Sequence, residues 1–179
     1  LYAYDGATVT TLLDLPAGGG RQVSEWSDSG DFLGDDTRVF WKQANDLAGV
    51  EVHTIDLSAA DPGATLAIVD VEAGVGSGAD VFGRAAFVNG RLYWVASATG
   101  LLAEQALWTT TDGTDAVKVS GIDLRDPFGY PGSLTTLGSE VFFLALDEAT
   151  GTQGIFQVND DGVTATLVSP AGQFAGALA

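Results

Sequence analysis

A unit of about 50 residues recurs along the chain, and this repetition constrains the fold more than any other feature. Each copy has a turn, an apolar and aromatic run, a polar or glycine-containing loop and a second alternating run, in residues 36–57, 89–114 and 138–162. The aromatic runs begin at Val39, Leu92 and Val141, so successive runs lie 53 and 49 positions apart. A period of about 40 to 50 residues is typical of the four-stranded blades of β-propellers.

Each unit contains four segments with the composition of β-strands. The segment after the second run is rich in Val, Thr, Ile and Leu, which strands prefer, in residues 7–15, 64–71, 116–122 and 163–169. A further segment precedes the aromatic run, in residues 23–34, 81–89 and 131–138. Dipeptides such as Asn89-Gly90 and Asp112-Gly113 mark hairpin turns between the segments. The sequence therefore predicts an all-β fold, a β-propeller built of four-stranded antiparallel blades.

Because the units follow one another along the chain, we expect residues 1–179 to form one propeller repeat region. Residues 1–15 supply the last two strands of a blade, and complete blades follow at 23–71, 79–122 and 131–169. Residues 172–179 would begin a further blade or close the ring with the opening half blade, which removes exposed sheet edges. One strand is missing from such a closing blade, and the chain starts in mid-pattern. We therefore expect a partial propeller or a fragment of a larger ring.

The charge is strongly one-sided, with 24 acidic against 7 basic residues and a net charge of -17. A nucleic-acid partner is not expected, because its binding requires Lys and Arg to neutralise phosphates. Anionic membrane surfaces are disfavoured for the same reason, and no run of about 20 apolar residues predicts membrane insertion. The charge instead favours solubility, basic partners and divalent cations. The absence of Cys excludes disulfides and thiolate metal sites.

The densest acidic run, SDSGDFLGDD, holds Asp28, Asp31, Asp35 and Asp36. Carboxylate oxygens on a glycine-containing loop suit Ca²⁺, so these four residues are calcium candidates. Their spacing differs from the twelve-residue calcium loop, and a solvated loop is the alternative. Trp26 lies in the same polar stretch, outside the repeated aromatic positions. It is the best candidate for an exposed ligand contact, for example with a sugar, and burial beneath a loop is its alternative.

No arrangement of residues predicts catalysis or a cofactor. The TDGT stretch at 111–114 has one Gly followed by a strand, which indicates a hairpin turn and not a phosphate-binding loop. His53 is the only histidine, and it occupies the repeat position of Trp108 and Phe156, which indicates packing. Neither GxSxG nor HExxH occurs. A glycosidase-like pair of carboxylates remains an alternative, because their separation in space is not visible in a sequence.

The stretch ALWTTTDGT (106–114), preceded by FVNGRLYWVA (87–96), resembles the ELW-x-[ST]-DGT repeat of a bacterial β-propeller family. Ala106 stands where the family has Glu, and one extra Thr precedes Asp112. In the other units Val52-His53 and Ile155-Phe156 replace Leu-Trp, so the strict motif covers about one blade. The resemblance implies a module of large secreted or surface proteins that share no catalytic activity.

These observations together predict a non-enzymatic interaction, adhesion or scaffold module of a bacterial secreted or surface protein. It would lie outside the cell, on its surface or in the periplasm, and bind a protein or a glycan. One alternative is a carbohydrate-active propeller enzyme or metal-assisted hydrolase domain, whose carboxylates would cluster at the mouth of the ring. Another is a structural subunit that completes its ring by assembling with other chains.

Overall fold

The structure is a computed structural model, and it describes residues 2–4, 7–11, 23–24, 32–45, 49–71, 85–97, 105–124, 134–147 and 149–169. These residues form β-strands and one short 3-10 helix, η1 (Pro62–Thr65). No α-helix occurs among them, and no helix of this part of the chain is long and apolar enough to cross a membrane. The predicted all-β fold is confirmed for the described residues.

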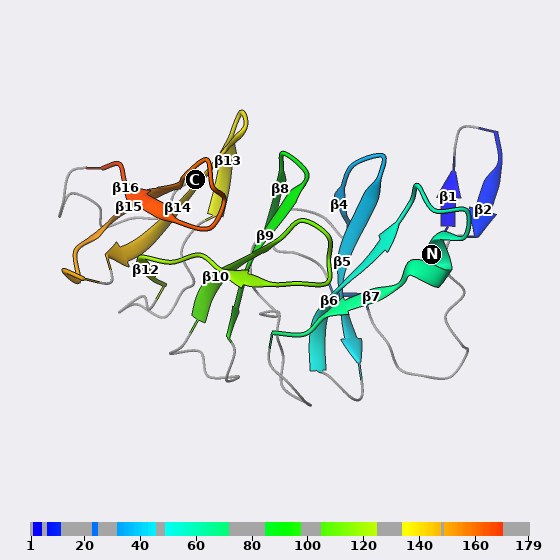
Figure 1. Cartoon of the computed structure of the whole chain (residues 1–179), viewed down its shortest axis with the longest axis horizontal. Coiled ribbons are helices and arrows are strands. Elements are labelled where there is room, and N and C mark those ends of the chain that lie inside the picture. Colours follow the sequence, from blue (N-terminus) through cyan, green and yellow to red (C-terminus); the bar gives the residue numbers. More distant parts are fainter. Residues whose placement is uncertain are drawn as a thin grey trace.

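Three antiparallel sheets, each four strand positions wide, follow one another along the chain (Figure 1). The first sheet contains β5 (Arg38–Asn45), β6 (Gly49–Asp56) and β7 (Ala67–Val69), and both β3 (Val23–Ser24) and β4 (Leu33–Gly34) pair with the outer side of β5. The second contains β8 (Ala85–Val88), β9 (Arg91–Ser97), β10 (Gln105–Thr110) and β11 (Val117–Lys118). The predicted four-stranded antiparallel sheets are therefore present.

The third sheet repeats the plan of the first. Its strands β14 (Glu140–Asp147), β15 (Gln153–Val158) and β16 (Ala165–Leu167) pair in sequence order. Its first position is shared by β12 (Ile122–Asp123) and β13 (Leu134–Leu137), which both pair with β14. A separate hairpin joins β1 (Tyr2–Tyr4) and β2 (Val9–Thr11). Among the described strands none pairs the first sheet with the last, and the sheets stand in a row.

Residues 116–122, expected as one strand, are divided between two sheets. Val117 and Lys118 pair with β10, whereas Ile122 and Asp123 pair with β14 of the third sheet. Gly121, with φ +84°, lies between the two pairings in a conformation that glycine adopts readily. The chain crosses between Val119, whose amide donates to Leu107 of the second sheet, and Ser120, whose amide donates to Val163 of the third, before the end of the segment that the sequence indicated.

The second sheet is covered on both faces, which explains its uninterrupted apolar run LYWVA. Leu92 and Trp94 belong to a core cluster shared with the first sheet, where Phe40 and Val52 lie. Tyr93 lies on the opposite face of β9 and belongs to a cluster shared with the third sheet. Because successive side chains of a strand point to opposite faces, a strand between two cores must be apolar at every position.

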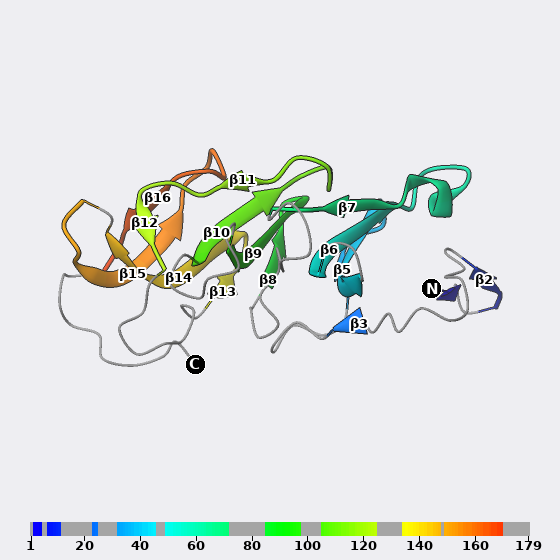
Figure 2. The same ribbon diagram turned by 90° about the horizontal axis from the view of Figure 1, so that it is seen from below.

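The sheets meet through their first strands. Strand β8 contacts β4 of the first sheet and both β13 and β14 of the third. The β4–β5, β8–β9 and β13–β14 hairpins point toward the same edge of the row (Figure 1), and Figure 2 shows the row from below. Side chains from the turns of neighbouring sheets are therefore brought together along that edge.

Candidate functional site

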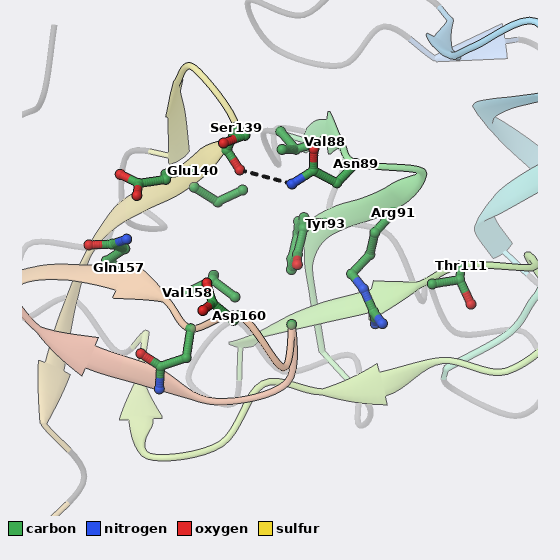
Figure 3. A pocket seen from close by; sticks show the side chains of 13 residues that line it. Val88, Asn89, Arg91, Tyr93, Thr111, Ser139, Glu140, Gln157, Val158 and Asp160 are labelled. Atoms are coloured by element: carbon green, nitrogen blue, oxygen red, sulfur yellow. Dashed lines mark hydrogen bonds between the residues drawn. The ribbon is translucent and has the colours of Figure 1, made fainter.

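A polar pocket of about 340 Å³ lies at the seam between the second and third sheets (Figure 3). It is lined from the second sheet by the β8–β9 turn, the start of β9 and the β10–β11 turn. From the third sheet it is lined by the β13–β14 and β15–β16 turns and by the ends of the strands that they join. The site therefore consists of residues from two sequence units that meet only through sheet packing.

Apolar side chains form part of the pocket wall. Val88, Val141 and Val158 line it together with Tyr93, whose side chain is 5% exposed. Burial raises the pKa of Tyr93 above its usual range, although the charge of Arg91 partly opposes this effect. The phenol is therefore neutral at physiological pH and can act as a hydrogen-bonding group with an apolar ring.

Asn89 ties the two hairpins together at the rim of the pocket. It has φ 53°, in the left-handed region that Asn tolerates better than most residues, and Gly90 follows it with φ 72°. Its Nδ2 donates a hydrogen bond of 3.2 Å to the carbonyl oxygen of Ser139 (Figure 3). The Asn-Gly turn that the sequence indicated thus also makes a contact between sheets, which the sequence did not predict.

Arg91 packs against the β15–β16 turn of the third sheet. A Cβ atom placed on Gly162 would lie 2.7 Å from Nε of Arg91, and φ of Gly162 is +73°, a conformation that favours glycine. The neighbouring Asp161 has a lowered pKa, chiefly because the Thr164 hydroxyl and the amides of Val163 and Thr164 donate to it. The positive charge of Arg91 lowers the pKa of Asp161 further.

Several polar side chains of the pocket form no hydrogen bond within the described part of the chain. They are a cation, two carboxylates, an amide and a hydroxyl: Arg91, Glu140, Asp160, Gln157 and Thr111. Figure 3 shows Arg91 on one side of the opening and Glu140 with Gln157 on the other. Glu140 and Gln157 share a strand face with Phe142, opposite to Val141 and Phe143, so these two residues border the pocket from the outer face of the third sheet.

The sequence-predicted calcium candidates are only partly covered by the described residues, since Asp28 and Asp31, like Trp26, lie outside them. Asp35 is in the β4–β5 turn, where its Oδ1 accepts from the amide of Thr37 at 2.8 Å, from the Thr37 hydroxyl at 2.7 Å and from the amide of Arg38 at 3.0 Å. The Thr37 hydroxyl bond is the main cause of the lowered pKa of Asp35. This carboxylate shapes the turn.

Asp36 is exposed in the same turn. Across the described residues, no group of three or more His, Cys, Asp or Glu side chains is arranged to hold a metal ion. The calcium hypothesis accordingly gains no support from the part of the cluster that the structure describes.

The TDGT stretch forms the turn between β10 and β11, as predicted. Oδ1 of Asp112 accepts from the amides of Thr114 at 2.9 Å and Asp115 at 3.2 Å, and Gly113 has φ +76°. These bonds, led by that from the Thr114 amide, lower the pKa of Asp112 to about 2. The carboxylate is thus ionised and held by its own turn, which is the expected behaviour of Asp in such loops.

His53 is in a packing position, as its place in the repeat indicated. It is buried, and its ring stacks on Trp41 with the ring centroids 5.7 Å apart. Its Nδ1 lies 3.2 Å from the carbonyl oxygen of Glu51, and Nε1 of Trp41 donates to Oε1 of Gln43 at 2.9 Å. These residues share the face of the first sheet that points away from the second.

Sequence reasoning missed the pocket, although the repeat contained a signal for it. Arg38, Arg91 and Glu140 occupy the same position, directly before the aromatic run in the three units. The change from Arg to Glu at this position distinguishes the third sheet from the other two. Attention to charge changes at repeated positions would have singled out Arg91 and Glu140.

A comparison of the chain with models of known protein families finds no match, and a comparison with curated proteins finds none either. The resemblance of residues 106–114 to the ELW-x-[ST]-DGT repeat therefore rests on the sequence pattern alone.

Proposed function

We propose that the chain is a run of β-propeller blades that serves as a non-enzymatic interaction module of a bacterial secreted or surface protein. The observation that carries the proposal is that neighbouring sheets pack by one repeated contact. Arg38 of the first sheet donates to the carbonyl oxygen of Asp112 in the β10–β11 turn of the second. Arg91 of the second sheet packs against the Asp161-Gly162 turn of the third. Repetition of one contact supports a blade array, in which each unit contacts only its neighbours.

The aromatic positions support the same relation between sheets. Phe40, Tyr93 and Phe142 occupy one repeat position, and the first two face the sheet that follows their own. Phe40 and Tyr93 are buried, whereas Phe142 is partly exposed. Phe142 pairs with Gln157 on the face of the third sheet that is opposite to Val141 and Phe143, which face the second sheet. Each sheet thus presents the same face to the sheet that follows it, as successive propeller blades do.

The aspartates with lowered pKa values have a local role in turns. Asp35, Asp56, Asp112, Asp147 and Asp161 have lowered pKa values, and each accepts hydrogen bonds from residues two or three positions further along. A general acid or base works best with a pKa near the working pH, which these carboxylates do not have. We therefore assign them to turn formation and assign ligand contact to the pocket between the second and third sheets.

The proposal is tested by incubating the labelled chain with bacterial cell envelopes that are untreated, protease-treated or periodate-treated. We expect saturable binding to the untreated envelopes and its loss after one of the two treatments. Loss with protease identifies a protein partner, and loss with periodate identifies a glycan. Absence of saturable binding, or release of reducing ends from envelope polysaccharide by the chain, would contradict a non-enzymatic interaction module.

The outer face of the third sheet favours a second candidate, a structural subunit that assembles with other chains. Phe142, Leu144 and Ile155 on this face are partly exposed, and Leu137 is 71% exposed. Exposed apolar surface on a sheet is typical of contacts between subunits. Analytical ultracentrifugation over a hundredfold concentration range distinguishes the two candidates, since a monomer throughout that range would contradict the subunit.

A further inference from the structure

We infer that the outer face of the third sheet binds the β1–β2 hairpin of a second copy of the chain, in a head-to-tail contact. The outer face is the side of the third sheet that points away from the second, and it includes Phe142, Ile155 and Val168. The inference rests on the proposed array of blades and goes beyond it, because it names the partner that this exposed surface accepts.

The outer face repeats a surface that the second sheet buries. Val168 corresponds to Val119, because their amides donate to the carbonyl oxygens of the matching residues Ile155 and Leu107. Val119 is 0% exposed in the core shared with the third sheet, whereas Val168 is 49% exposed. Other matched positions also have the more exposed residue in the third sheet, namely Tyr93 and Phe142, Leu107 and Ile155, and Val88 and Leu137. The third sheet therefore has the surface for a following sheet but leaves it exposed.

The β1–β2 hairpin presents the other half of such a contact. The repeat aligns Tyr2 with Phe156, and the two residues pair across a turn with Thr11 and Leu167. Phe156 faces the preceding sheet and is 1% exposed, whereas Tyr2 is 66% exposed. Val9, two residues before Thr11, lies on the same side of the hairpin and is 65% exposed. The hairpin therefore offers the surface that, in the other units, packs on a preceding sheet.

The two exposed surfaces lie at opposite ends of the row. Figure 1 shows the hairpin beside the first sheet and the third sheet at the other end. A second copy supplies the missing half to each surface, and the contact that forms is the one that already joins neighbouring sheets within the chain. Such a contact is heterologous, so it joins unlike surfaces and produces closed rings or longer rows.

Charge sets the strength of this contact. The repeat position that carries Arg38 and Arg91 carries Glu140 in the third sheet. Arg38 donates to a carbonyl oxygen in the turn of the following sheet, and an ionised carboxylate has no proton to donate. The sequence also has Asp5 between the two hairpin strands, and each chain carries a net charge of -17. The contact between copies is therefore mainly apolar, and salt strengthens it because salt screens the repulsion between acidic chains.

The experiment measures the mass of the whole chain by analytical ultracentrifugation. We expect masses above that of the monomer, which rise with protein concentration and with salt from about 0.05 to about 0.5 M. Glu140→Arg restores the donor of the repeat, so it should tighten the association at least about tenfold, the order for one hydrogen bond from a charged group. A chain that stays monomeric throughout would overturn the inference.

Two variants test the two surfaces separately. Val168→Asp changes the outer face and Tyr2→Asp changes the hairpin, and each should remove the association, because burying an unpaired carboxylate is costly. Both native side chains are exposed in the single chain, so both variants should fold, which circular dichroism checks. The matched control is Val117→Asp, at a residue 45% exposed on β11, which should leave the mass unchanged. An equal loss of association in this control would overturn the inference.

A mixture of the two variants tests the head-to-tail geometry. Val168→Asp keeps an intact hairpin and Tyr2→Asp keeps an intact outer face, so an equimolar mixture should form a dimer. The dimer should grow no further, because its two remaining surfaces both carry the substitutions. Self-association of Tyr2→Asp alone, with no gain on mixing, would show that outer faces bind each other and would overturn the head-to-tail contact.

The envelope assay separates failure of this inference from failure of the proposed function. A monomeric chain that still binds envelopes saturably would retain the interaction module and reject the contact between copies. A chain that self-associates but shows no saturable envelope binding would support the contact and contradict the interaction module.

Discussion

The guanidinium of Arg38, at the start of β5, donates a hydrogen bond to the main-chain carbonyl oxygen of Asp112, in the turn after β10. The two residues are 74 positions apart and belong to different sheets. Arg91 makes the corresponding approach to the turn that contains Gly162. One arginine position in the repeat thus connects the first sheet to the second and the second to the third.

The contact predicts that Arg38→Gln destabilises the chain by about 1.5–3 kcal/mol, the range for losing a hydrogen bond that involves a charged group. The ion pair of Arg38 with Asp56, at 3.7 Å and partly exposed, should add little to this loss. Urea denaturation should show a lower midpoint with an unchanged slope. The control is Lys118→Gln on exposed β11, and an equal loss in both variants would contradict the role of the Arg38 contact.

The close packing at the β10–β11 turn predicts a large effect of Gly113→Ala. Gly113 has φ +76°, and an added Cβ would collide with Thr54 of the first sheet. Thr54 cannot easily yield, because it is buried and its hydroxyl donates to the carbonyl oxygen of Val39 at 2.9 Å. We expect a loss of about 3 kcal/mol from combined backbone strain and overpacking, measured by urea denaturation.

Gly90→Ala provides the matched control for this substitution. Gly90 has φ +72°, but nothing lies within 4 Å of the added Cβ. Its loss should therefore be about 1 kcal/mol, from the backbone conformation alone. Equal stability of Gly113→Ala and Gly90→Ala would contradict the close packing of the β10–β11 turn against Thr54.

The lowered pKa of Asp112 predicts a specific pH dependence. Its folded-state pKa is about 2 and its usual value is 3.8, so its stabilisation is complete above about pH 4 and is lost as the pH falls toward 2. Because the side chain is exposed, solvent screening limits the contribution to about 1 kcal/mol. Asp112→Asn should be less stable than the unmodified chain at pH 7 by about this amount. Thermal unfolding should show the difference disappearing near pH 2, and a difference independent of pH would contradict the assignment.

Phe142 and Phe143 are adjacent on β14, and substituting each of them tests which face of the third sheet is buried. Phe143 is 1% exposed and packs in the core shared with the second sheet, whereas Phe142 points to the opposite face and is partly exposed. Phe143→Ala should cost about 3–5 kcal/mol, the usual range for a core aromatic, and Phe142→Ala about 1–2 kcal/mol. If urea denaturation showed a larger loss of stability for Phe142→Ala than for Phe143→Ala, the assignment of the core to the Phe143 face would be wrong.

Much of the fold could be predicted from the chain because its signals are local. The Asp112-Gly113 turn needs only an Asp that accepts nearby amides and a glycine with positive φ. The strands of the three sheets follow from alternating or continuous apolar runs bounded by such turns. The split of residues 116–122 was not predictable, since Val117 and Ile122 have similar strand propensities and only pairing with different neighbours separates them.

The candidate site could not be predicted from local signals. The repeat period, the aromatic positions and the turns are properties of short segments, so the sequence alone determined an all-β chain of repeated four-stranded antiparallel sheets. The meeting of Arg91 with Gly162, and of Asn89 with Ser139, depends on how one sheet packs on the next. Only the tertiary structure decided this, because packing of two faces joins side chains about 50 or more residues apart, which no local pattern specifies.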